Sequence, residues 1–522
     1  MILPITQRNE YQDHDSYCLL LLLALLVSSF VACKKTDLPR GDAPVSPTTG
    51  TRSQFTADSI FLYARQIYLW NDALPGYQTF NPRSYAASGS DLLNFKQIVF
   101  AVSQSKINPV TGKAYEKTGV EGHPKYSYIQ SLNGASGILA AVNSEGAGND
   151  FGIEVSSVGK DLYLRIVYPG SAAAGSGLQR GDQLLKVNGQ QATAGLILPA
   201  LEGQTLSLTL QKKDGSQRDI VLNKSAYQSS LVLKTAEYLL NGTKLGYLAI
   251  SQFNPLNNSK TALDNAFARF ASSGVSDLVI DLRYNGGGYV GTAKYLANLI
   301  ASGSLNGKVM FTEHFNTRMQ EGKADILKNQ LYFDENNQPV YLNGRRATYA
   351  DVDFTVKGNT CNFEKAGSLE TVKNLYFIVG NQTASASEML VNSLKPYFKV
   401  SLIGQQTYGK PVGFFGIKID RYQLYLSSFL IRNSAGFSDY FEGMSVDIPA
   451  EDDVTHDFGE ENEACLNAVF KVLKANGPKS QAKTMEVSAP DAPTSLANPV
   501  KHISGGRGFP GMIEQGLKLR IN

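Results

Sequence analysis

The sequence predicts a multi-domain α/β protein, and three observations support that prediction. The chain has 522 residues, several times the length of a typical domain of about 150 residues. Hydrophobic residues make up 43% of it and charged residues 18%, a balance that is typical of globular proteins and excludes a coiled coil or a largely disordered chain. Along the chain the apolar periodicity is first helical, then strand-like, and then alternates between strands and helices. We therefore expect three folded units in that order.

The segment 1–33 has the features of an export signal. Residues 18–32 form an apolar run that is shorter than the roughly 20 residues of a membrane-spanning helix. The residues before Cys33, Phe-Val-Ala, resemble a bacterial lipobox, which implies that Cys33 is lipidated and that the protein lies in the bacterial cell envelope, facing the periplasm or the cell exterior. A plain cleaved signal is the alternative. The segment 34–54, with its three prolines, is typical of a solvated linker.

The segment 55–135 is predicted to be a small helical module. Apolar residues recur at helical spacing over 58–70, and Pro75-Gly76 follows that stretch. Residues 92–102 predict a second short helix. We expect this module to pack against a larger domain.

The segment 150–226 is predicted to be rich in strands. Residues 162–167 are β-prone, and residues 206–210 alternate between leucine and Ser/Thr before a turn at Asp214-Gly215. Between these strands, residues 177–189 follow the pattern Gly-x-x-x-Gly-Asp-x-Leu-x-x-Val-Asn-Gly. This segment resembles a PDZ domain of the bacterial protease type.

The PDZ resemblance implies a peptide-binding strand edge at Phe151, Gly152, Ile153 and Val155. Backbone amides there would bind a terminal carboxylate, and the peptide would add a strand to the sheet. We expect an apolar groove lined by Ile153 and Val155 together with residues of neighbouring strands. A PDZ fold that is only a spacer is the alternative.

The segment 233–475 predicts the α/β core. Apolar strands are expected at 245–250, 277–282, 375–379 and 400–403, with helices at 259–272 and after Thr383. Residues 302–372 show no clear period and are interpreted as an insertion. The tail 476–522 is rich in Ala, Pro, Ser, Gly and Lys and is predicted to be disordered.

Three short motifs each follow a predicted strand of this core. They are DLRYNGGGY at 281–289, TASASEM at 383–389 and TYGK at 407–410. With the PDZ pattern before them, they resemble the C-terminal processing (tail-specific) serine peptidases, whose core is crotonase-like (ββα). That resemblance implies a Ser–Lys dyad of Ser385 and Lys410, which are 25 residues apart, whereas Ser387 would give 23. Taken alone, Ser385-x-x-Glu388 would be only a capping box.

Elementary chemistry supports these roles. A serine hydroxyl needs a base, and a lysine can serve when burial lowers its pKa toward neutrality. Lys410 has aromatic and apolar neighbours in sequence and no adjacent carboxylate, so we predict a lowered pKa. We expect the oxyanion to be bound by the amides of Ala386, at a helix start, and of Gly287.

Other residues either match or differ from those that are usual in the family that the chain resembles. Arg283, Glu388 and Thr407 match positions that shape the site in the family. Many relatives have a glutamine at the position of Phe414 and others an aspartate at the position of Pro396, so no third catalytic residue is predicted, although Gln405 or Gln406 is a candidate to orient the lysine.

The predicted function is that of a serine endopeptidase that cleaves exported or misfolded polypeptides, selected by their unstructured C-termini. The alternatives are a catalytically inactive peptide-binding lipoprotein and a hydrolase in which His456 is the base. Lys plus Arg (49) nearly balance Asp plus Glu (46), so nucleic acid is not expected as a partner, and the membrane is expected only through the lipid anchor. No metal or cofactor is predicted, because the histidines lack ligand spacing and the Gly-x-Gly-x-x-Gly at 506–511 follows no strand. A Cys361–Cys465 disulfide and the oligomeric state are left open.

Overall fold

The structure, a computed structural model, describes residues 47–86, 89–132, 142–334, 338–475, 500–504, 511–513 and 517–520. The predicted signal, Cys33 and most of the predicted linker lie outside these ranges. Within the described residues, no helix has both the length and the apolar character that crossing a bilayer requires.

A six-stranded sheet forms the centre of the α/β core, in the order β10-β11-β12-β18-β19-β24. All neighbours pair in parallel except β10 and β11, which are antiparallel. Parallel strands that are covered on both faces need near-continuous apolar sequence, which DLVID and NLYFIV supply. The bounds are β10 (Val232–Leu240), β11 (Thr243–Ile250), β12 (Asp277–Asp281), β18 (Asn374–Val379), β19 (Lys399–Gly404) and β24 (Ile448–Pro449).

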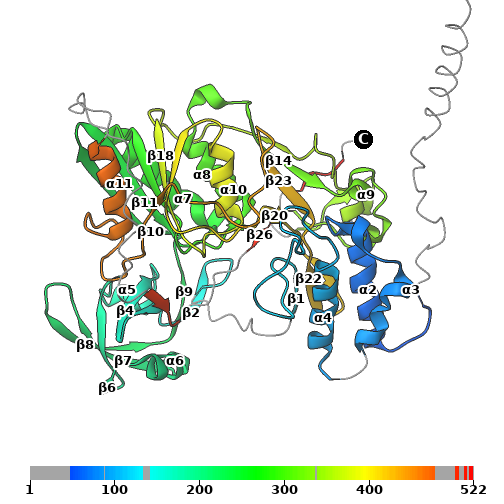
Figure 1. The fold of residues 1–522 in the computed structure, drawn as a ribbon, viewed down its shortest axis with the longest axis horizontal. Coiled ribbons are helices and arrows are strands. Elements are labelled where there is room, and N and C mark those ends of the chain that lie inside the picture. Colours follow the sequence, from blue (N-terminus) through cyan, green and yellow to red (C-terminus); the bar gives the residue numbers. More distant parts are fainter. Residues whose placement is uncertain are drawn as a thin grey trace, which may run out of the picture.

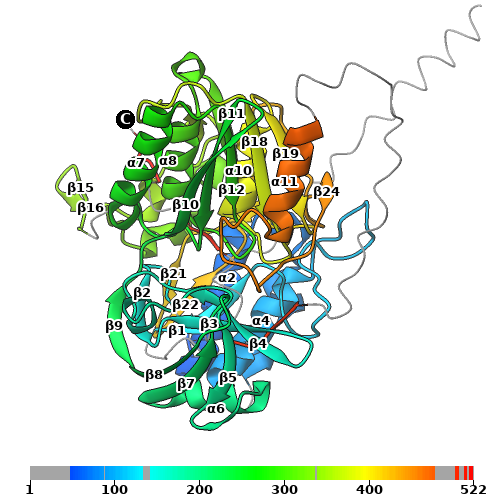
Figure 2. The ribbon, with the colours of Figure 1, turned by 90° about the vertical axis from the view of Figure 1, so that its left-hand side faces the viewer.

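Helices cover both faces of this sheet (Figures 1 and 2). α7 (Leu256–Ser273), α8 (Val290–Ile300) and α10 (Ala386–Leu394) bury their apolar faces in one core cluster. α11 (Ala464–Ala475) packs on the opposite face in a second cluster. The turns that lead from β12 to α8 and from β18 to α10 both lie at the carboxyl ends of the strands, because neighbouring parallel strands end on the same side of the sheet. Two of the sequence motifs therefore meet there.

The PDZ segment forms its own sheet around its own hydrophobic core. Figure 2 shows it below the central sheet. Its elements are β3 (Ile153–Val158), β4 (Asp161–Val167), α5 (Ala172–Gly175), β5 (Gln183–Val187), β6 (Gln190–Gln191), α6 (Ala194–Glu202), β7 (Thr205–Gln211) and β8 (Gln217–Asn223). A short ladder of β2 (Ala147–Asp150) with β9 (Ser225–Gln228) connects it to the core.

The N-terminal helices pack directly on the α/β core. α2 (Arg52–Ile67), which begins with a capping box of Thr51 and Gln54, and α4 (Asp91–Ser103) share one apolar cluster with the central sheet. β1 (Tyr128–Ser131) adds to a sheet with β22 (Tyr422–Tyr425) and β21 (Ile417–Ile419). The segment just before β1 is thereby placed beside residues that follow the TYGK motif.

Two expectations need correction. The proposed insertion contains β14 (Val309–Phe315) and β17 (Thr360–Asn362), which form a sheet with β23 (Phe429–Asn433) and β20 (Val412–Gly413), so it is an integral layer of the core. The tail predicted to be disordered contains β25 (Val500–His502) and β26 (Met512–Ile513) among its described residues. Both strands obtain their hydrogen bonds from the edges of other domains, which the composition of the tail does not show.

The remaining described elements are short and connect the larger ones. They are η1 (Asn71–Ala73), α3 (Tyr77–Phe80), η2 (Pro82–Ala86), β13 (Gly288–Tyr289), η3 (Gly303–Leu305), α9 (Thr317–Gln320), η4 (Asp325–Asn329), β15 (Tyr341–Leu342), β16 (Arg345–Arg346) and η5 (Tyr349–Asp351). The predicted fold class, an α/β core with a β-rich PDZ domain and a helical N-terminal module, is confirmed.

Candidate active site

Ser385 lies between β18 and α10, at the N-cap of the helix. Its backbone has φ 62° and ψ −116°, a conformation that residues other than glycine rarely adopt and that costs about 1–3 kcal/mol. The side chain is fully buried, and its Oγ has no hydrogen-bond partner among the described residues. A strained backbone and an unpaired buried hydroxyl are both costly, which is typical of a residue held for function.

The carboxylate of Glu388, one turn into α10, joins the serine to the lysine. Its Oε2 accepts the N–H of Ser385 at 2.9 Å and the N–H of Lys410 at 2.8 Å. Its Oε1 accepts the N–H of Gly409 at 2.7 Å and the hydroxyl of Thr407. Burial raises the pKa of Glu388, and the hydrogen bonds act in the opposite direction. One oxygen atom therefore lies within hydrogen-bond distance of the backbones of both predicted dyad residues.

Lys410 is fully buried in aromatic surroundings. Its Nζ lies 4.1 Å from the ring centroid of Phe414 and 5.9 Å from that of Tyr126. Burial lowers the pKa of Lys410 to about 7, against the charges of Glu116 and Glu388, which raise it. Phe414, which occupies the position of the expected glutamine, thus contacts the ammonium through its ring face.

The N-terminal module contributes residues that the sequence did not point to. The hydroxyl of Tyr126 donates to the carbonyl of Gly409 at 2.6 Å. Glu116 is fully buried and accepts the N–H of Ser127 at 2.7 Å and the hydroxyl of Ser427 at 3.0 Å, while burial raises its pKa. These residues are far from Lys410 in sequence and belong to no motif, so only the packing of the module on the core places them here.

The triple-glycine turn lies against the serine. Gly287 has φ 110°, and a Cβ on it would lie 2.8 Å from the Cβ of Ser385, so no larger residue fits. Its N–H donates to Asn285 Oδ1 at 2.9 Å, which occupies the amide that we predicted as an oxyanion donor. The next amide, that of Gly288, donates to the carbonyl of Gly511 at 2.7 Å. Ala386 is the first residue of α10, where an N–H has no intrahelical acceptor.

Arg283 belongs to a different cluster, a group of charged residues where the core meets the PDZ domain. Its buried guanidinium contacts Asp281 at 2.7 Å, Asp452 at 3.0 Å and Glu463. Arg180 of the PDZ domain reaches the same Asp452 at 2.8 Å. All three partners of Arg283 are core residues, and Arg180 joins the PDZ domain to the cluster through the shared Asp452. The predicted supporting role of Arg283 beside the serine stays a prediction.

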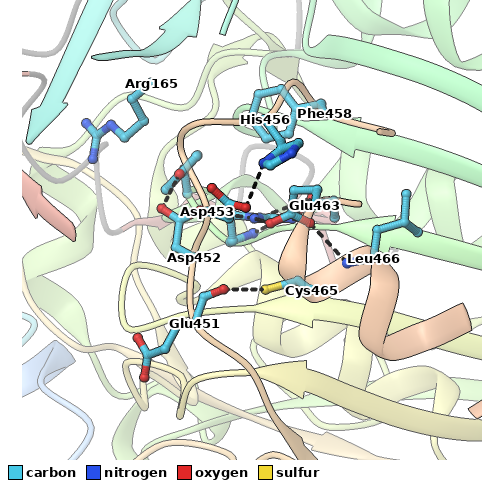
Figure 3. Close-up of polar contacts among 12 residues, drawn as sticks. Arg165, Glu451, Asp452, Asp453, His456, Phe458, Glu463, Cys465 and Leu466 are labelled. Carbon is cyan, nitrogen blue, oxygen red and sulfur yellow. Dashed lines mark hydrogen bonds and ion pairs between the residues drawn. The ribbon is translucent and has the colours of Figure 1, made fainter. Parts of the chain in front are cut away.

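His456 belongs to this inter-domain cluster as well (Figure 3). Its Nδ1 lies 2.7 Å from Asp453 Oδ2, and its carbonyl accepts from Arg180. These contacts do not support His456 as a base for Ser385. The proposed lysine orienters also bond elsewhere: Gln405 donates to Glu451 and Gln406 to the carbonyl of Glu442, each at 2.7 Å.

The predicted peptide-binding edge of the PDZ domain is only partly as expected. Val155 bonds through its backbone to a segment of the tail, and the N–H of Gly152 donates to Asp150 Oδ1 at 2.7 Å. The side chains of Phe151, Ile153 and Val155 belong to the interior of the PDZ domain. Ile503 of the tail packs against the same apolar cluster, so this edge offers an apolar contact as well as main-chain pairing.

Neither cysteine of the described core is in a disulfide: Cys361 lies on β17 and Cys465 on α11. The described residues contain no group of three or more His, Cys, Asp or Glu side chains arranged to hold a metal ion.

Comparison with known proteins assigns two segments of the chain. Residues 244–429 match the model of peptidase family S41, and residues 141–194 match that of the PDZ domain. The carboxyl-terminal-processing peptidase 1 of Arabidopsis thaliana chloroplasts is 27% identical over 267 residues, which cover 49% of this chain and 46% of the relative. The carboxyl-terminal-processing protease of a Picosynechococcus strain is 24% identical over 256 residues, 48% of this chain and 50% of the relative. The chain thus spans about half the length of these relatives.

Among solved structures, a protein of Bacteroides fragilis assigned to the S41 proteases is similar with a TM-score of 0.52 and 22% identity. The similarity covers 80% of this chain and 97% of that one, and it establishes a shared fold.

Proposed function

We propose that this chain, in which residues 244–429 belong to peptidase family S41 and form a serine-type peptidase domain, is an endopeptidase with Ser385 as nucleophile and Lys410 as base. The observation that carries the proposal is the carboxylate of Glu388, which binds the backbone amides of both residues. One carboxylate oxygen thus holds together the backbones of a serine whose hydroxyl has no partner among the described residues and of a lysine with a pKa of about 7.

The reaction proceeds in two steps. Neutral Lys410 accepts the proton of Ser385 Oγ while Oγ attacks the substrate carbonyl, and the resulting ammonium returns the proton to the leaving amine as the C–N bond breaks. Water then hydrolyses the acyl ester: Lys410 takes a proton from the attacking water and returns it to Ser385 Oγ as the acyl C–O bond breaks. The developing oxyanion is bound by the amides of Ala386 and Gly288, since the Gly288 amide already holds a carbonyl oxygen beside the serine.

Two aromatic rings lie beside the lysine. Phe414 and Tyr126 flank Nζ and exclude water from it, and the Tyr126 hydroxyl fixes the lysine loop at Gly409. The Ser–Lys hydrogen bond is absent in this structure, and it forms when a substrate carbonyl is in place, as catalytic hydrogen bonds often tighten in the substrate complex.

The substrates are exported or misfolded polypeptides with unstructured C-termini. Backbone pairing along β3 of the PDZ domain requires an extended segment that is free of its own secondary structure. Lipidation of Cys33 attaches the protein to the envelope membrane, where such chains are met.

An active-site label tests the proposal against the inactive peptide-binding alternative. A fluorophosphonate probe should label the wild type and not Ser385→Ala, and digestion of an unfolded tagged peptide should follow the same pattern. Ser387→Ala is the matched control, because Ser387 is an equally buried serine on the same helix whose hydroxyl donates to the carbonyl of Asn285 at 3.0 Å. Equal labelling of wild type and Ser385→Ala would refute the assignment.

A further inference from the structure

The tail of the chain adds a strand to the PDZ domain at its predicted peptide-binding edge. β25 pairs antiparallel with β3, with Val500 opposite Val158 and His502 opposite Ser156. Beyond β25, the carbonyl of Val155 accepts the N–H of Ile503 at 2.9 Å and that of Ser504 at 3.1 Å. The N–H of Val155 donates to Ser504 Oγ at 2.9 Å. Figure 1 shows this red strand beside the PDZ domain.

A buried arginine of the PDZ domain also binds the tail. Arg165, which is fully buried, donates from Nη2 to the carbonyl of Ser504 at 3.0 Å and from Nη1 to the ring of His502. The hydroxyl of Ser156 lies 3.1 Å from the same His502 ring. The contact thus combines main-chain pairing with side-chain recognition, as in a peptide complex.

The tail returns at the active site. β26 pairs in parallel with β13, with Met512 opposite Gly288. The carbonyl of Gly511 accepts the Gly288 amide at 2.7 Å, and the carbonyl of Met512 accepts the Phe414 amide at 3.2 Å. A Cβ on Gly287 would lie 2.6 Å from Gly511 O and 2.8 Å from the Cβ of Ser385, so this carbonyl lies beside the nucleophile.

A third contact holds the tail at residues 351–353 of the core. The carbonyl of Lys518 accepts the N–H of Asp353 at 2.8 Å, and the N–H of Arg520 donates to the carbonyl of Asp351 at 2.8 Å. The side chain of Met512 is fully buried, and that of Leu517 nearly so. The described parts of the tail therefore bind at the PDZ edge, at the glycine turn and beyond it.

We propose that the described tail segments 500–504 and 511–513 are an internal inhibitor that occupies the substrate path in cis. The inference rests on the proposed function, because the two edges that the tail fills are those that a substrate would need. The direction of the tail also fits: it runs antiparallel to β3 toward Gly152, the direction of a peptide whose C-terminus binds at that end. Displacement of the tail, by substrate or by proteolysis, would activate the enzyme.

The expected change in cleavage rate follows from the effective concentration of the tethered tail. A tethered segment acts at an effective concentration of about 1 mM, so a peptide with a Kd of about 0.1 mM in trans lowers the rate about tenfold in cis. Losing two hydrogen bonds weakens such a segment by about tenfold.

The test compares four chains on an unfolded fluorogenic reporter at limiting substrate. They are the wild type, a chain ending at Pro499, the full chain with Ser504→Pro, and a control chain ending at Arg520. Ser504→Pro removes the N–H and the Oγ that bond to Val155, and it changes only the tail. In parallel, a fluorescein-labelled peptide of residues 499–520 is titrated by anisotropy against two Ser385→Ala receptors, the chain ending at Pro499 and the Ser504→Pro chain.

We expect the chain ending at Pro499 to be about tenfold faster than the wild type, Ser504→Pro several-fold faster, and the control unchanged. The labelled peptide should bind with a Kd of about 0.1 mM or tighter. Rates within twofold of the wild type for both tail variants, or no peptide binding at 1 mM, would overturn the inference. If no chain shows cleavage that depends on Ser385, the proposed function fails, and peptide binding alone decides whether the tail occupies these edges.

Discussion

The pH dependence of the rate is set by the burial of Lys410. Its pKa is lowered from the ordinary 10.5 to about 7, because desolvation disfavours the ammonium more than Glu116 and Glu388 favour it. About a tenth of the lysine is then neutral at pH 6, half at pH 7 and about nine-tenths at pH 8. An exposed lysine would be less than about a thousandth neutral at pH 7. We therefore expect kcat/KM to rise about tenfold from pH 6 to its plateau.

The assay measures kcat/KM from pH 5.5 to 8.5 on an unfolded reporter that has no histidine. Phe414→Leu removes the ring face 4.1 Å from Nζ, and a cation–π contact of about 0.5–1 kcal/mol corresponds to about half a pKa unit. Losing it should move the midpoint of the rising limb to lower pH. Phe415→Leu is the matched control, since that ring stacks on Tyr349 and Phe354 instead. A flat profile, or identical midpoints in all three proteins, would refute the role of Lys410 as base.

The lowered pKa of Lys410 also makes the free energy of unfolding depend on pH. Between about pH 7 and 10.5 the unfolded chain binds a proton at Lys410 that the folded chain lacks, so this group makes stability rise with pH across that window. Below the window both states are protonated, and the full destabilising effect is present. Lys410→Met should therefore unfold at higher urea concentration than the wild type at pH 6.5, with a difference that shrinks toward pH 9.

Three further outcomes are expected. Ser385→Ala and Lys410→Ala should each abolish digestion of the unfolded peptide while near-UV circular dichroism stays that of the wild type, and near-normal turnover by Lys410→Ala would contradict the dyad. Glu388→Gln presents an amide N–H₂ to donors that now bond to a carboxylate, so the free energy of unfolding in urea should fall by about 2–4 kcal/mol and kcat should drop. Cys33→Ala should appear in the soluble fraction after cell fractionation. If this variant is still bound to membranes after a salt wash, the prediction that Cys33 carries a lipid anchor is wrong.

Strands and helix starts that depend on local sequence pattern could be predicted without the structure. The near-continuous apolar runs at 277–282 and 375–379 predicted buried parallel strands, and the structure has strands at 277–281 and 374–379. The spacing of Ser385 and Lys410 is likewise local, because each follows a strand of one parallel sheet and such strands end at a common edge. The capping pattern predicted that Ser385 lies at a helix start, but it did not predict the strained backbone of this residue.

The remaining residues of the site are brought together by contacts between distant segments, which the sequence alone did not predict. The ring of Tyr126 and the charge of Glu116 reach Lys410 because β1 pairs with β22, a contact between distant segments. Arg283 pairs with Glu463 and Asp452, whose proximity no local spacing encodes. The tail has the composition of a disordered segment, yet its strands form because the PDZ edge and the glycine turn offer unpaired backbone groups. Hydrogen bonds supplied by a distant edge leave no periodicity in the segment that receives them.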